Sequence, residues 1–101
     1  MVWTTTALAQ DSWTLTVNLL NVPLGAHKIY VVVKSPFGSD WSEWVDNQIN
    51  PHAVFPLLKN EFPSGYYFKI CAGTNSLGTH PCSTYRSTGN NQTLNWHFSS
   101  S

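Results

Sequence analysis

The chain has 101 residues, enough for one domain with one hydrophobic core, and its 42% hydrophobic content excludes an intrinsically disordered chain. Its formal net charge is zero and its five basic residues are dispersed along the sequence, so nothing predicts the basic stripe that nucleic acids or anionic lipids require. No apolar run approaches the ~20 residues of a membrane-spanning helix.

Seven short segments with the pattern of β-strands follow one another along the chain. In the first, apolar residues occupy every odd position from Trp13 to Leu19 and polar residues lie between them, as in a strand with one buried face. Turn-forming residues, among them those at 35–38 and 62–65, separate the segments. We expect strands at 13–21, 29–33, 41–45, 53–58, 66–72, 82–86 and 93–99.

The fourth and the last of these segments predict further features of the fold. Pro56 cannot donate a ladder hydrogen bond, so the fourth strand is expected at a sheet edge or at a bulge. In the last strand, Leu94, Trp96 and Phe98 are expected to point inward. Because no segment shows a sustained helical period, the sequence predicts an all-β fold, a single Greek-key antiparallel β-sandwich of about seven strands.

The order of the segments at Val17–Gly25, Tyr30–Gly38 and Pro63–Cys82 resembles immunoglobulin-like and fibronectin type III domains, and also small secreted archaeal β-sandwich proteins of unassigned role. The resemblance implies the fold and no particular function. One feature departs from it. Antibody-type domains join their two sheets through widely separated cysteines, whereas both cysteines of this chain lie late and close together.

Cys71 ends one predicted strand and Cys82 begins the next. A disulfide across this hairpin would close a short loop and would indicate an oxidising compartment, so the protein is expected to be secreted or at the cell surface. Two buried, reduced thiols are the alternative. Asn91-Gln92-Thr93 is an acceptor sequence for N-glycosylation, which predicts a glycan on Asn91 if the chain is exported.

The aromatic residues are the candidate ligand-binding groups, because they are more numerous than one small core can enclose. Strand alternation sends Trp41 and Trp44 to opposite faces, and likewise Tyr66 and Tyr67, so one ring of each pair is expected to be exposed. Such rings could stack on sugars or anchor a protein partner. The alternative is that they only stabilise cross-strand pairs.

The sequence offers no catalytic, metal or cofactor site. The four histidines lack the close pairing of zinc ligands, and Asp40 and Asp46 point away from Glu43 if they share a strand. No nucleophile elbow, zinc-protease motif or phosphate loop is present. We therefore expect that the chain is not an enzyme and that it needs no cofactor.

The domain is expected to span 13–101, preceded by an arm or export-signal remnant at 1–12. Ala7-Leu8-Ala9 is similar to a signal-peptidase site, but Val, Trp and Thr in the same stretch also favour an extended arm that could pair with a sheet edge. The sequence thus predicts a non-catalytic extracellular module that is structural or binds protein, including by self-association through sheet edges. Carbohydrate binding through the exposed rings is the alternative.

Overall fold

The computed structural model describes residues 11–23, 25–46, 51–74 and 80–98 of the chain. Within them lie seven strands and no helix, and so none that could cross a membrane. Each strand falls on a segment expected from the pattern of the sequence. The strands are β1 (Ser12–Leu20), β2 (Lys28–Lys34), β3 (Asp40–Asp46), β4 (His52–Leu58), β5 (Tyr67–Gly73), β6 (Cys82–Arg86) and β7 (Gln92–His97).

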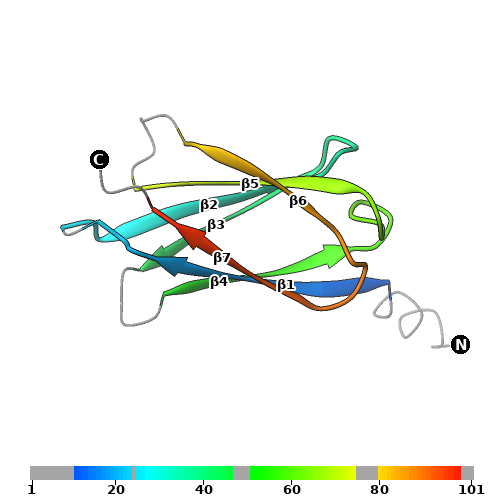
Figure 1. Cartoon of the computed structure of the whole chain (residues 1–101), viewed down its shortest axis with the longest axis horizontal. Helices are drawn as coiled ribbons and strands as arrows, with labels where there is room; N and C mark the ends of the chain where they lie inside the picture. Colours follow the sequence, from blue (N-terminus) through cyan, green and yellow to red (C-terminus); the bar gives the residue numbers. More distant parts are fainter. Residues whose placement is uncertain (1–10, 24, 47–50, 75–79, 99–101) are drawn as a thin grey trace, which may run out of the picture.

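The strands form two sheets, with the orders β4-β1-β7 and β3-β2-β5-β6, packed as a sandwich (Figure 1). After the β2–β3 hairpin the chain crosses to β4 in the other sheet and returns as β5 on the free side of β2. That route is a Greek key. The predicted all-β sandwich of seven strands is confirmed.

The expectation of a wholly antiparallel sandwich is wrong at β7. This strand pairs with β1 in parallel, from Leu15 opposite Gln92 to Leu20 opposite His97. The direction of β7 follows from the connections that cross between the two sheets. Because β2 and β6 are both antiparallel to β5, they run the same way, and one reversing connection between the sheets links β1 to β2 and another links β6 to β7. β7 must therefore run in the direction of β1.

The core consists of the inward faces of the two sheets. Alternate residues are buried along β1, β2 and β4, and Phe68 and Ile70 continue the pattern in β5. Trp96 and Phe98 are buried as expected, and Leu94 is partly buried and packs against the core. This period of two confirms the sorting of side chains that the sequence predicts.

Two further expectations concern the position of β4 in its sheet and the residues that precede β1. β4 lies at the edge of its sheet, with Pro56 opposite Thr14, as the proline requires. Most of the expected arm at 1–12 lies outside the described residues. Its last two residues already belong to the sandwich, because the carbonyl of Asp11 accepts a hydrogen bond from the amide of Lys59 at 2.8 Å and Ser12 is the first residue of β1.

Candidate functional site

A row of three rings crosses one end of the outer face of the four-stranded sheet. The rings of Trp44 and Tyr30 are 4.8 Å apart between centroids, and those of Tyr30 and His80 are 5.5 Å apart. Gly73 pairs with Tyr30 in the ladder, and a Cβ at this position would overlap the His80 ring. The imidazole therefore lies directly over the backbone of Gly73, a place that only glycine leaves open.

The disulfide lies beside this row and joins β5 to β6. Cys71 and Cys82 are direct partners in the ladder and their sulfur atoms are bonded, which confirms the predicted bridge and overturns the alternative of reduced thiols. The neighbouring pair is hydrogen-bonded from the amide of Ala72 to the carbonyl of Pro81. The cysteines thus occupy a non-hydrogen-bonded position, where side chains on antiparallel strands approach most closely.

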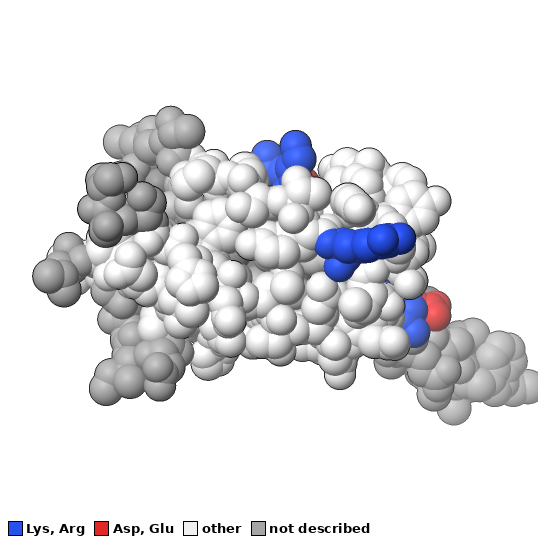
Figure 2. Space-filling model, in the orientation of Figure 1, with Lys and Arg blue, Asp and Glu red and all other residues white. Residues whose placement is uncertain are grey.

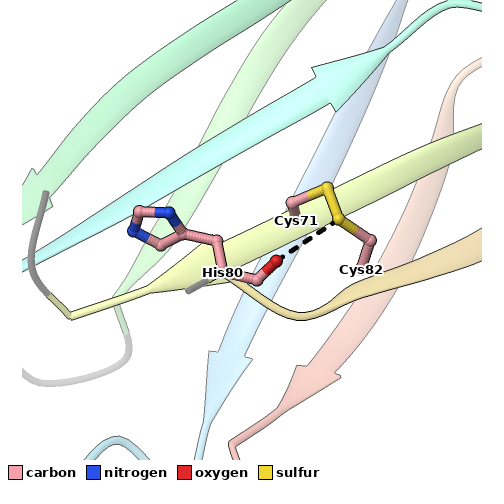
Figure 3. The surroundings of a disulfide bond; sticks show 3 residues. All are labelled: Cys71, His80 and Cys82. Carbon is pink, nitrogen blue, oxygen red and sulfur yellow. Dashed lines mark hydrogen bonds between the residues drawn. A yellow bond between two sulfur atoms is a disulfide. The ribbon is translucent and has the colours of Figure 1, made fainter. Parts of the chain in front are cut away.

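The backbone carbonyl and the imidazole ring of His80 point in different directions, as Figure 3 shows. Its carbonyl oxygen lies 3.4 Å from Sγ of Cys82, while its ring points away from the disulfide toward Tyr30. The disulfide fixes the start of β6 close to β5, and this placement also holds His80 over the sheet.

Two adjoining hollows lie on the same outer face and share Lys34 and Asp40 in their linings. The one beside the disulfide is lined also by Tyr30 and His80. The other, of about 490 Å³, is lined also by Tyr67, Lys69 and Thr84. Lys34 has Asp40 as its ladder partner on one side and Lys69 on the other, and Lys69 in turn faces Thr84. We call the hollow around Lys34, Lys69 and Tyr67 the sheet groove.

Aromatic side chains gather around the far end of the sheet groove. Tyr67 is 53% exposed, and the guanidinium carbon of Arg86 lies 5.8 Å from the centre of its ring. Tyr66 and Phe37 are also about half exposed, with their rings 5.3 Å apart. Three of the five basic residues of the chain therefore lie on one face with the exposed ring of Tyr67: Lys34, Lys69 and Arg86.

The predicted exposure of one ring per pair holds for the tryptophans and fails for the tyrosines. Trp44 is 45% exposed, whereas Trp41 packs against the core and its indole N–H donates to Oε1 of Glu61 at 3.1 Å. Tyr66 and Tyr67 are both exposed. Tyr66 precedes β5 and its amide donates to the carbonyl of Pro63, so it belongs to a turn and the alternation of the strand does not reach it.

The structure thus brings Trp44 and Tyr67 to the same outer face, places Tyr66 at its corner and turns Trp41 away toward the core. Ligand binding by any of the four stays a prediction. The adjacency of Lys34 and Lys69 was missed, because they are 35 positions apart in the sequence. Only the register of β2 against β5 makes them neighbours.

Asn91 is exposed just before β7, and its Oδ1 accepts a hydrogen bond from the amide of Thr14 at 2.9 Å. Glycosylation there stays a prediction. Among the described residues, no group of three or more His, Cys, Asp or Glu side chains could hold a metal ion. Asp40, Glu43 and Asp46 are all exposed along β3.

The four sheet edges differ in how they discourage pairing with another strand. β3 carries three carboxylates, β4 contains Pro56, and β6 has five residues and ends at Arg86. Charges, proline and distortion are the usual means of blocking an edge. β7 has none of these features in its six residues. Figure 2 shows few charged side chains on the side of the molecule where β6 and β7 lie.

Comparison with protein-family models, curated proteins and solved structures gives no significant match to the chain. The likeness to immunoglobulin-like and fibronectin type III domains therefore extends no further than an all-β sandwich. Two features of the molecule itself bear on function: the open edge of β7 and the sheet groove.

Proposed function

We propose that this chain is a non-catalytic extracellular structural module that associates with a second copy of itself through β7. The observation that carries the proposal is the open edge of this strand, which is uncharged and free of proline while the three other edges carry blocking features. The disulfide and the low content of charge support an extracellular setting.

The backbone direction at β7 supports the same contact. The amide of Phe98 donates to the carbonyl of Leu20 on β1. Backbone groups of successive residues in a strand alternate between its two sides. The amides and carbonyls of Thr93, Asn95 and His97 therefore point away from β1, toward the open edge.

Two copies of β7 fit each other when they meet antiparallel about a twofold axis at Asn95. Thr93 of one copy then faces His97 of the other, and the two Asn95 residues face each other, so about six backbone hydrogen bonds form. On the inner side, Leu94 meets Trp96 of the second copy. The two three-stranded sheets would become one six-stranded sheet, and neutral copies repel each other little.

Charge reversal at Asn95 tests this pairing. Asn95 is exposed and loses only its side-chain hydrogen bond to Asn18 when replaced. Asn95→Lys and Asn95→Asp should each weaken self-association on the order of tenfold, because like charges would face each other across the axis. An equimolar mixture of the two variants should restore association as a heterodimer. Analytical ultracentrifugation over a wide concentration range measures all of these states.

Two control proteins identify the surface in contact. Thr84→Lys places the same charge on the exposed edge strand β6 and should leave association unchanged. Deletion of residues 1–10 should also leave it unchanged. A wild-type protein that stays monomeric at every concentration would refute self-association. Association that survives both Asn95 variants but is lost with the deletion would show that the arm, and not β7, makes the contact.

A further inference from the structure

We infer that the sheet groove is a binding site for an acidic polysaccharide, one that carries carboxylate or sulfate groups on its sugar rings. The site lies on the outer face of the four-stranded sheet, whereas β7 belongs to the other sheet. Binding in the groove and self-association through β7 are thus separate activities, and neither depends on the other.

The distribution of charge gives the sign of the ligand. Lys34 and Lys69 are direct ladder partners, and like charges in that position are unfavourable for the sheet. Arg86 lies on β6 two residues beyond Thr84, the ladder partner of Lys69. The groove itself is lined by two cations, Lys34 and Lys69, and by one carboxylate, that of Asp40, and Arg86 adds a third cation beside Tyr67. In a chain with zero net charge, this local excess of positive charge favours an anionic ligand.

The neighbouring side chains supply what a sugar needs besides charge. The exposed ring of Tyr67 offers an apolar surface to the C–H face of a sugar ring, and Phe37 and Tyr66 extend this surface beyond the end of the groove. Asp40 can accept hydrogen bonds from sugar hydroxyls, and Thr84 can both donate and accept them. A purely ionic partner such as a phosphate chain would leave the rings and Asp40 without a role.

The groove also has the shape for a chain and not only for a single ring. It shares Lys34 and Asp40 with a second hollow on the same face, which the disulfide, Tyr30 and His80 line. Trp44 lies at the outer end of that row, 45% exposed. The seven residues from Tyr67 to Gly73 span roughly 20 Å, so the two groups of rings can contact different sugars of one polymer.

Affinity electrophoresis and calorimetry with matched polymers test the inference. We expect dextran sulfate or polygalacturonate to bind at low ionic strength and neutral dextran not to bind, and comparison of the two acidic polymers distinguishes sulfate from carboxylate recognition. Lys34→Gln with Lys69→Gln should weaken binding by roughly tenfold per lysine, the usual worth of a hydrogen bond to a charged group. Tyr67→Ala should weaken it on the order of tenfold, and Tyr67→Phe should keep most of the affinity.

Lys59→Gln removes one lysine charge outside the groove and should bind like the wild type. Urea unfolding of every variant establishes that the fold is retained. Equal binding to polyglutamate or single-stranded DNA would mean that charge alone is recognised, and it would overturn the inference. So would equal binding to dextran, unchanged binding after loss of both lysines, or absence of binding to both acidic polymers.

Discussion

Phe62 connects distant parts of the core through one backbone atom. Its ring is fully buried against Phe68, with a centroid separation of 6.0 Å. Its carbonyl accepts two hydrogen bonds, from the indole N–H of Trp13 at 3.1 Å and from the hydroxyl of Ser87 at 3.2 Å. A buried carbonyl with two donors keeps a partner when either donor is removed.

This arrangement predicts that removal of both donors lowers the free energy of unfolding by more than the sum of the two single changes. Trp13→Phe and Ser87→Ala should each leave the Phe62 carbonyl with one donor, whereas the double variant leaves it with none. An unsatisfied buried acceptor costs about 1 to 3 kcal/mol, so the free energy of unfolding should show a coupling of at least about 1 kcal/mol. Urea unfolding of the four proteins measures it, and additivity within about 0.5 kcal/mol would contradict the shared acceptor.

The sequence predicted that Trp13 points inward, because period-two alternation decides which face a side chain takes. It could not predict the partner of the indole, which lies 49 positions away. The same limit applies to the candidate site. The exposure of Trp44 followed from its strand, but the contact of Tyr30 with His80 depends on Gly73 and on how β6 begins.

At the scale of elements, the β5–β6 hairpin depends most on a single covalent link. β6 has no fully buried residue, so it contributes little to the core, and the disulfide attaches it directly to the well-buried β5. An edge strand with few buried side chains is expected to separate from its sheet more readily than a central strand. The bridge offsets this weakness.

Removal of the bridge should therefore lower the stability of the whole sandwich. Replacing both cysteines by alanine is expected to reduce the free energy of unfolding by about 3 kcal/mol, the contribution of a closed loop of this length. A reductant should lower the urea midpoint of the wild type by a similar amount and leave the double variant unchanged. If the reductant shifted the variant as well, its effect could not be assigned to the disulfide.

The positions of all seven strands were predictable, because each has its own alternation and its own bounding turns. The parallel direction of β7 was not, since it depends on the two connections that cross between the sheets and on the shared antiparallel partner of β2 and β6. The exposure of Tyr66 was missed for a local reason. A turn extends one residue further than the pattern suggests and delays the start of β5.

At the scale of the whole molecule, the few charged residues are distributed unequally between the two proposed surfaces. The five basic and five acidic residues balance, and β7 carries none of them. Three of the basic residues nevertheless gather at the sheet groove, because the ladder brings distant positions together. Sequence order alone suggested an even scatter of charge, and with it no binding to nucleic acids or anionic lipids.

Salt should therefore separate the two activities in one protein. Raising NaCl from about 0.05 to 0.5 M shortens the screening length severalfold, so binding of an acidic polysaccharide should weaken by an order of magnitude or more. Self-association through uncharged backbone groups should change by less than about twofold over the same range. Sedimentation and polymer binding measured in the same buffers give both values, and a parallel loss of the two would contradict the assignment of separate surfaces.

The parallel pairing of β1 with β7 also has a mechanical consequence. The start of β1 and the end of β7 lie at opposite ends of a molecule with a longest dimension of 53 Å (Figure 1). Tension applied between these two points would pull the strands past each other along their length. Every hydrogen bond between them would then bear load at once instead of opening one after another, which is the arrangement in which a sheet resists stretching best.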